Sequence, residues 1–247
     1  MADELIDYYK TYYKDHQEGS YCMEAAADTS RVKLIKEYLE QYLEPGDKVL
    51  DVGCGDMHLS TIMPQFEWRG IDINTELAQG KAVVHDLMTP PYPFEDSTFD
   101  AVVCSEVLEH LWDLRVVQKE VARVLKPDGL YVMSTPNFDW IWYQMNMYRG
   151  LLFDPAQSHL FEHIRQYNHQ VHEKHLKEAG FAPFEVVGAD AHYNPLFADL
   201  RMRLAEYVND LCDEPVVTEW DIDVQLGKAY PTISHTIMIL SRNGKSS

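Results

Sequence analysis

A carboxylate followed by two glycines is the first feature of this sequence that indicates binding chemistry. The short apolar run 48–52 contains Asp51, and Gly53 and Gly55 follow it at alternate positions. Glycine permits unusual backbone angles and lets a ligand lie close against the main chain. A carboxylate just before such a turn suits a ligand with a positively charged or hydroxyl-rich part. The sequence therefore predicts a binding site where a buried strand ends, with an ordinary tight turn as the simpler alternative.

The same glycines can be compared with the dinucleotide-binding fingerprint, which has glycine at its first, third and sixth positions. Counted from Gly53, these positions hold Gly53, Gly55 and His58, so the third glycine is missing. The fingerprint also has an acidic residue about 20 positions further on, and Asp72 lies at that distance. The pattern favours a ligand with a ribose over one with a bare pyrophosphate.

Size and charge narrow the class of protein. The chain has 247 residues, enough for one large domain with a sizeable core. Its 40 acidic residues against 21 lysines and arginines give a formal charge of −19, which repels phosphate backbones and argues against a nucleic-acid partner. The four cysteines form no metal-type pairs, which fits a reducing, cytoplasmic compartment. We expect neither a secretory signal nor a membrane span, because no apolar stretch reaches roughly 18 residues.

Apolar periodicity alternates between strand-like and helix-like segments along the chain. This alternation predicts a mainly parallel sheet that is covered by helices on both faces. The expected helices are 30–43, 57–64, 113–125, 169–179 and 196–211, and the expected strands are 48–52, 68–73, 82–85, 99–104, 129–134, 184–187 and 235–240.

The domain organisation expected from the sequence is a single domain over residues 1–247. The segment 136–167 is rich in Trp, Tyr, Phe, Met and His and has no clear period. A long aromatic connection of this kind is typical of a lid or pocket wall and is too short for a separate domain. We expect a second such insertion at 190–230 and an N-terminal helical cover at 1–45.

Five segments, taken together, resemble the motifs of one enzyme family. They are 49–55, 70–72, 85–87, 99–111 and 125–129. In this order and spacing, the chain resembles the class I S-adenosylmethionine-dependent methyltransferases, in their quinone-type or small-molecule branch. The resemblance implies an α/β fold with a Rossmann-like, seven-stranded, mostly parallel sheet, helices on both faces and an antiparallel last strand. It also implies S-adenosyl-L-methionine as the cofactor.

The resemblance places the cofactor at the ends of several strands. It implies that Asp51 meets the ammonium group of the methionine part, that Asp72 accepts from the ribose hydroxyls and that Asp86 meets the adenine amino group. Asp72 and Asp86 could instead end strands and cap loops. Met57 departs from the family pattern, which often has a third glycine there. The implied cofactor-binding residues are Asp51, Gly53, Cys54, Gly55, Asp72, Ile73, Asp86, Leu87, Ser105 and Glu106.

The chemistry of methyl transfer sets what else the sequence must supply. Transfer from a sulfonium is an in-line displacement, so the protein mainly aligns the acceptor. A hydroxyl acceptor also benefits from a general base, whereas an amine needs only its neutral form. The segment 162–168 resembles a stretch that precedes a helix in quinone-type and in sugar- or lipid-modifying methyltransferases, which makes His163 the leading base candidate. His110 is the second, and for both a structural role is the alternative.

The function expected is methyl transfer to an oxygen or nitrogen of a small-molecule acceptor, including one linked to a sugar or a lipid. A nicotinamide-dependent oxidoreductase is disfavoured by the missing third glycine. A catalytically inactive, cofactor-binding partner subunit is compatible with the same motifs. Histidines at 159, 163, 169, 172 and 175 have spacings that could suit zinc, but helix 169–179 also needs a core face, and we expect no metal. The sequence leaves the oligomeric state open, and a dimer is compatible with it.

Overall fold

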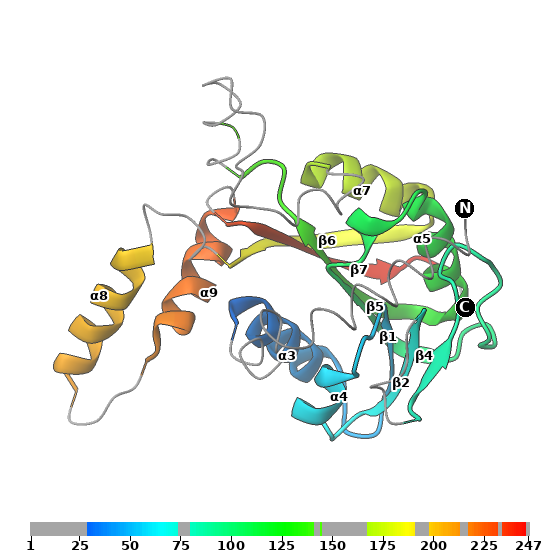
Figure 1. Ribbon diagram of the computed structural model, residues 1–247, viewed down its shortest axis with the longest axis horizontal. Coiled ribbons are helices and arrows are strands. Elements are labelled where there is room, and N and C mark those ends of the chain that lie inside the picture. Colours follow the sequence, from blue (N-terminus) through cyan, green and yellow to red (C-terminus); the bar gives the residue numbers. More distant parts are fainter. Residues whose placement is uncertain are drawn as a thin grey trace.

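The centre of the fold is a seven-stranded sheet with the order β3-β2-β1-β4-β5-β7-β6 (Figure 1). It is seen in a computed structural model, which describes residues 29–73, 80–140, 144, 167–190, 198–212, 217–231 and 234–245. The strands are β1 (Lys48–Val52), β2 (Glu67–Asp72), β3 (Ala82–Val84), β4 (Phe99–Ser105), β5 (Leu125–Pro136), β6 (Phe181–Ala189) and β7 (Thr236–Asn243). Neighbours among β1 to β5 pair in parallel, and β7 runs antiparallel to both β5 and β6. The predicted fold class, including its antiparallel last strand, is confirmed.

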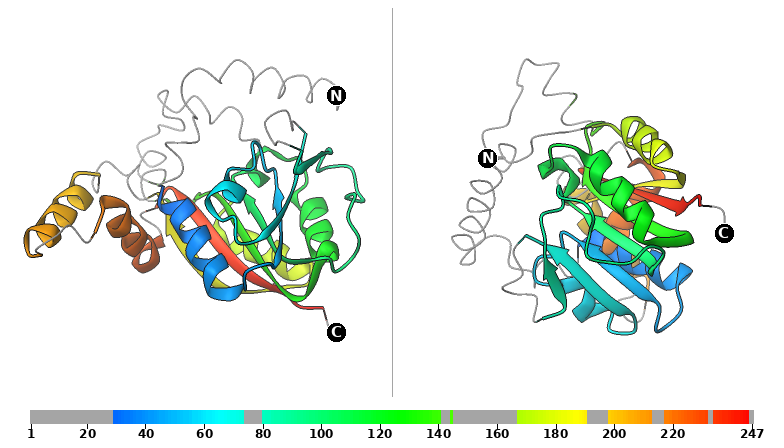
Figure 2. Two further views of the ribbon diagram at one scale, coloured as in Figure 1. Left: turned by 90° about the horizontal axis from the view of Figure 1, so that it is seen from below. Right: turned by 90° about the vertical axis from the view of Figure 1, so that its right-hand side faces the viewer.

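Helices cover both faces of this sheet. They are α3 (Ser30–Tyr42), α4 (His58–Ile62), α5 (Leu114–Val124), α7 (His169–Glu178), α8 (Ala198–Asp210) and α9 (Glu219–Ala229), with a short 3-10 turn η1 (Leu108–His110) after β4. Side chains of α3, α4 and α9 pack on one face, and those of α5 and α7 pack on the other (Figures 1 and 2). Helix α8 packs on α9 and lies at the outer end of the molecule, away from the sheet (Figure 1).

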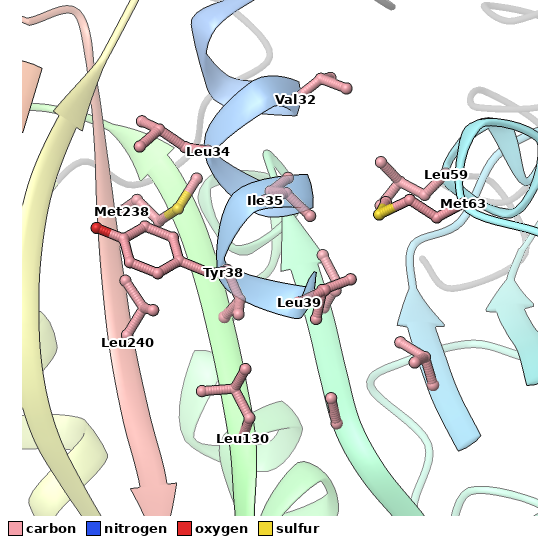
Figure 3. Close-up of a cluster of buried hydrophobic side chains, with 14 of the residues drawn as sticks. Val32, Leu34, Ile35, Tyr38, Leu39, Leu59, Met63, Leu130, Met238 and Leu240 are labelled. Atoms are coloured by element: carbon pink, nitrogen blue, oxygen red, sulfur yellow. The ribbon is translucent and has the colours of Figure 1, made fainter. Parts of the chain in front are cut away.

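The sheet separates two apolar clusters because its central strands are buried on both faces. Val49 of β1 belongs to the cluster beneath α3, and its neighbour Leu50 belongs to the cluster beneath α5. Figure 3 shows the first cluster, in which Leu39 of α3 lies with Leu130 of β5 and Leu240 of β7. Burying one such side chain contributes roughly 1.5–3 kcal/mol. The two clusters hold the central strands in register and so fix the positions of the strand ends.

Two predicted helix starts are confirmed by their caps. The Thr29 hydroxyl accepts from the backbone N–H of Val32 at 3.3 Å and begins α3. The Asn168 side chain accepts from the N–H of Val171 at 3.0 Å and begins α7, as the sequence predicted. Each cap satisfies a backbone donor that has no partner inside the helix.

Helix α9 was not predicted, and it corrects the expectation of a single helix in 190–230. Its large apolar residues, from Trp220 to Leu226, fall on alternate positions, which is a period of two and does not indicate a helix. The helix is begun by a capping box between Thr218 and Asp221. It approaches β6 so closely that a Cβ atom at Gly227 would collide with the carbonyl oxygen of Gly188. Tertiary packing and a cap, not amphipathic periodicity, determine this helix.

Part of the expected domain layout falls outside the residues that the structure describes. Residues 1–28 of the helical cover and 145–166 of the lid, with His163, are in this part of the chain. The layout of a cover and two insertions therefore stays a prediction. Among the described helices, none is both long and apolar enough to cross a membrane.

Candidate functional site

A pocket lies where the carboxyl ends of the parallel strands β1, β2, β3 and β4 meet. This edge of an open α/β sheet is where ligands bind in folds of this kind. Eight of the lining side chains come from the loops after β2, β3 and β4 and are apolar or acidic. The walls of the pocket are therefore mostly apolar, with a few polar groups. The lining residues are Gly53, Asp72, Ile73, Asp86, Leu87, Met88, Glu106, Val107, His110, Leu111 and Trp112.

The turn after β1 is closed by hydrogen bonds that its backbone N–H groups donate. Gly53 has φ 74°, and its N–H donates to the Ile71 carbonyl at 2.8 Å. A Cβ atom at Gly53 would collide with the side chain of Val107 in the pocket wall. Gly55 has φ 50° and donates its N–H to the Asp72 carboxylate at 2.9 Å. One glycine therefore keeps the pocket wall close, and the other orients Asp72.

Met57 stands where the family pattern often has glycine, and it keeps the glycine-like backbone. Its φ is 66° and its ψ is 33°, in the left-handed region, which costs a residue with a side chain of order 1 kcal/mol. The Met57 side chain is buried, and its sulfur occupies the space that a Cβ atom at Gly70 would need. The turn into α4 thus survives the substitution, with the methionine packed against β2.

Asp86 caps its own loop and also lines the pocket, and its contact with the adenine stays a prediction. Its Oδ1 accepts from the N–H of Met88 at 2.8 Å, and its Oδ2 accepts from the Thr89 hydroxyl at 3.3 Å. It therefore caps its own loop, and it also lines the pocket beside Leu87. The cap fixes the direction of the carboxylate.

Four predicted cofactor residues lie behind the pocket and not among the residues that line it: Asp51, Cys54, Gly55 and Ser105. Asp51 is only 5% exposed, and burial, followed by the nearby carboxylates of Asp72 and Asp56, raises its pKa to about 7. Cys54 is buried in the cluster beneath α3. The Ser105 hydroxyl is 2.9 Å from the hydroxyl of Ser134. Contact of these four residues with the cofactor stays a prediction.

Glu106 follows β4 in a strained backbone conformation, with φ 55°. The Ser134 hydroxyl donates to its Oε1 at 2.9 Å, and an Arg31 nitrogen lies 3.6 Å from the same oxygen. Burial raises the pKa of the Glu106 carboxyl, and the Arg31 guanidinium partly offsets that effect. Strained residues cluster at functional sites, and Glu106 is held at the pocket wall by partners from α3 and β5.

Glu109 and His110 form an acid–imidazole pair in η1. Glu109 is 2% exposed, and its Oε2 accepts from the Thr135 hydroxyl at 3.3 Å. Its Oε1 has no hydrogen-bond partner among the described residues and lies 3.9 Å from Nε2 of His110. Burial, and next the carboxyl of Glu106, raises the pKa of Glu109 well above its ordinary value. His110 therefore stands between a buried acid and the pocket.

Four lining residues were not identified from the sequence: Met88, Val107, Leu111 and Trp112. Met88 directly follows Leu87, and Val107 directly follows Glu106. Leu111 and Trp112 are the two residues after His110. Trp112 lines the pocket and is 59% exposed, so part of its ring is open to solvent. The sequence signal that could have identified these four residues is a large apolar residue in a loop that follows a strand.

The histidines of α7 are explained by packing. His172 is buried against the Tyr167 ring, with centroids 5.5 Å apart, and burial followed by His175 and His169 lowers its pKa to about 4. His169 Nδ1 is 2.8 Å from the Asp139 carboxylate. Within the described part of the chain, no group of three His, Cys, Asp or Glu side chains is placed to hold a metal ion. His163 and His159 lie outside this part, so the expectation of no metal stays a prediction.

Comparison with known proteins relates this geometry to established sequences. The family model described as "Methyltransferase domain" matches residues 23–207. A probable S-adenosylmethionine-dependent methyltransferase of Mycolicibacterium smegmatis is 28% identical over 156 residues, which are 58% of this chain and 55% of that protein. A ubiquinone biosynthesis O-methyltransferase of Haemophilus ducreyi is 38% identical over 109 residues, which are 37% of this chain and 46% of that protein. The match thus spans about half the length of these curated relatives.

The solved structures show the same architecture. A SAM-dependent methyltransferase from Archaeoglobus fulgidus superposes with a TM-score of 0.55 at 19% identity, over 90% of this chain and 100% of that chain. At 19% sequence identity, this similarity shows a shared fold.

Proposed function

This chain belongs to the methyltransferase-domain family, and on that premise we propose that it transfers the methyl group of S-adenosylmethionine to a small-molecule acceptor. The acceptor atom is an oxygen or a nitrogen, and we favour a hydroxyl oxygen. The observation that carries the proposal is one pocket with two kinds of polar group. Asp72 and Asp86 lie at its cofactor end, and His110 with the buried Glu109 lies at the β4 end.

The residues of the cofactor end fit S-adenosylmethionine by their chemistry. A carboxylate has about four lone-pair sites, and Gly55 uses one on Asp72, so this group can also accept from two ribose hydroxyls. The apolar side chains of Ile73 and Leu87 would lie against the adenine, and the fixed carboxylate of Asp86 would accept from its amino group. Gly53 brings its main chain to the pocket surface, where it would lie beside the methionine part. Asp51, just behind, would face the ammonium group.

When bound, the cofactor supplies a methyl group on a positively charged sulfur, which is already activated for displacement. The chain then has to hold the acceptor in line and remove its proton. His110 would accept the proton from an acceptor hydroxyl, because it lines the pocket and can hold that proton. The carboxyl of Glu109, whose Oε1 lies 3.9 Å from Nε2 of His110, would stabilise the resulting imidazolium in its ionised form. His163 stays a second candidate for the same role.

The walls near His110 suggest the kind of acceptor. Leu111 and Trp112 follow it directly, and Met88 comes from the loop after β3. Apolar and aromatic side chains of this kind suit a flat or apolar molecule that carries one reactive hydroxyl. The similarity to ubiquinone O-methyltransferases over 37% of the chain points in the same direction. We therefore propose a phenol-like or hydroquinone-like acceptor.

Two measurements test the proposal. Calorimetry should show binding of S-adenosylhomocysteine and negligible binding of NAD. Methyl-labelled cofactor should then be incubated with matched pairs of aromatic acceptors that differ only in carrying a hydroxyl or an amino group. Labelled product from the hydroxyl member supports the proposal. Binding without any turnover would favour the inactive partner subunit, and turnover of amines alone would contradict the role of a base.

A further inference from the structure

A line of exposed apolar side chains runs along the outer face of α8 and continues to Leu211, the residue directly after its end at Asp210. Leu200, Leu204, Tyr207 and Leu211 are 40%, 37%, 64% and 71% exposed. Their spacings of four, three and four residues place them on one stripe of the helix surface. This is the spacing of the contact seam between two paired helices. We refer to these four residues as the α8 stripe.

The opposite side of α8 is already occupied. The Arg201 guanidinium lies 4.4 Å from the centroid of the Trp220 ring of α9. Ala205 is buried, and the Asn209 side chain exchanges hydrogen bonds of 2.7 and 3.0 Å with the backbone of Val217. Residues 201, 205 and 209 recur every four positions and form the inner face. The α8 stripe therefore points away from α9. Helix α8 itself lies at the outer end of the molecule (Figures 1 and 2).

The charged residues beside the α8 stripe, Arg203 and Asp210, are complementary to those of a second copy of this chain. If Leu204 and Leu211 are the a positions and Leu200 and Tyr207 the d positions of a heptad, then Arg203 and Asp210 are both at position g. In an antiparallel pair of identical helices, g positions face each other across the seam. Arg203 of one copy then lies opposite Asp210 of the other, twice by symmetry. In a parallel pair, Arg203 would face the uncharged Val208 instead.

We propose that α8 is a homodimer contact, in which the α8 stripes of two copies of this chain pack antiparallel about a two-fold axis. A two-fold contact uses the same patch on both copies and must be self-complementary. The α8 stripe meets this condition in both shape and charge. Its apolar residues supply the attraction, and the charges at the g positions set the orientation. This surface lies apart from the pocket and does not depend on the proposed reaction.

The contact is small, so its strength can be bounded. The stripe spans eleven steps of 1.5 Å, about 17 Å, which places the interface at the low end of specific interfaces. We expect a dissociation constant of roughly 1–100 µM. Sedimentation velocity of the full chain at physiological salt, over a concentration series that brackets this range, measures it. A chain that stays monomeric throughout the series would overturn the proposal.

Matched variants locate the contact. Leu204→Glu should weaken association at least tenfold, because it places a charge in the apolar seam. Met202→Glu is the control, since Met202 is also exposed, at 46%, on the same helix but off the stripe; its dimer should match the original. If the two variants associate equally well, the dimer uses another face and the proposal is wrong. Tyr207→Ser serves as a second stripe variant if Leu204→Glu does not fold.

A charge swap tests the antiparallel arrangement. Arg203→Asp and Asp210→Arg, made separately, each set like charges opposite each other and should weaken association about three- to tenfold. The two changes in one chain restore opposite charges and should return the dissociation constant to within about twofold of the original. Failure of the double variant to recover, with its circular dichroism unchanged, would overturn the antiparallel pairing. A monomeric chain whose melting temperature falls in Leu204→Glu alone would show that a segment of the same chain covers the stripe.

Discussion

The carboxylates at the two ends of the pocket are held in different ways. At the end formed by β1, β2 and β3, Asp72 and Asp86 accept from the backbone N–H groups of Gly55 and Met88. At the end after β4, the buried Glu109 accepts from the side chain of Thr135, and its other oxygen lies 3.9 Å from His110 without a hydrogen bond to it. Backbone donors fix a carboxylate in one direction, whereas burial favours the neutral form of an acid such as Glu109.

This difference matches two tasks. A carboxylate fixed by the main chain is preorganised to recognise hydroxyl and amino groups, which needs no change of charge during a reaction. A buried acid next to an imidazole responds to charge, because a proton on the imidazole favours ionisation of the acid, and the ionised carboxylate then forms an ion pair with the imidazolium. The first end therefore suits cofactor recognition and the second suits proton transfer. The following variants test this division, beginning with the largest effect.

His110→Ala should lower turnover of a hydroxyl acceptor by roughly 10²–10⁴-fold, because the proton loses its acceptor. The affinity for S-adenosylhomocysteine should stay within about twofold, since His110 is at the other end of the pocket. Initial rates and calorimetry on the same preparation measure both quantities. His169→Ala, a histidine of α7 that does not line the pocket, is the matched control. Full turnover in His110→Ala would show that His110 is not the base and would leave His163 as the next candidate.

Asp72→Ala should weaken cofactor binding by roughly 2–4 kcal/mol, because two charge-assisted hydrogen bonds to the ribose are lost. The fold should persist, since Asp72 ends its strand at the sheet edge. Asp56→Ala is the control, a carboxylate in the neighbouring turn that does not line the pocket. Calorimetric titration with S-adenosylhomocysteine compares the three proteins. Equal dissociation constants would show that Asp72 only anchors the loop at Gly55.

Asp51→Asn tests the buried carboxylate behind the cofactor end. The pKa of Asp51 is raised to about 7 by burial first, so the folded chain binds this proton more tightly than the unfolded chain. Its contribution to stability is therefore full at pH values below about 4 and is lost as the pH rises towards 7 and above. The asparagine variant has no carboxyl to ionise and keeps its stability as the pH rises. The difference between its free energy of unfolding and that of the original chain should therefore grow by roughly 1–3 kcal/mol from pH 5 to pH 8.

Urea unfolding of both proteins at the two pH values gives this difference directly. Saturating cofactor should reduce it, because an ammonium group beside Asp51 favours the charged carboxylate. A stability difference that is the same at pH 5 and pH 8 would contradict the raised pKa. If cofactor leaves this stability difference unchanged, Asp51 does not contact the bound cofactor.

The sequence predicted the pocket lining after β1, β2 and β3 better than the lining after β4, for a physical reason. Turns that need glycine and strands that end in an acid leave a local signature, so Gly53, Asp72 and Asp86 could be identified from their own neighbours in the chain. The environment of Glu109 depends on Thr135, which lies 26 positions away on the adjacent strand. Burial and the distance between such side chains are properties of the packed sheet.

The same distinction separates the helices. α3 and α7 have apolar faces and N-caps that the sequence displays, and both were predicted. α9 has apolar residues at a period of two and is held by its close approach to β6 at Gly227 and Gly188, so nothing local indicated a helix. β6 is also longer than the predicted 184–187, because its pairing with β7 continues across an irregularity between Pro183 and Glu185.

Trp112→Ala should give the smallest effect, and it refines the comparison on the acceptor side. Trp112 lines the pocket next to Leu111 but is 59% exposed, so a bound acceptor would cover only part of its ring. Loss of that contact should raise KM for an aromatic acceptor about three- to tenfold, or roughly 1 kcal/mol. kcat should change little, because the contact is the same before and during transfer. Val84→Ala, an exposed apolar residue of β3 outside the pocket lining, is the control. If Trp112→Ala instead weakens S-adenosylhomocysteine binding and leaves KM for the acceptor unchanged, the ring belongs to the cofactor end, and the boundary between the two ends lies beyond η1.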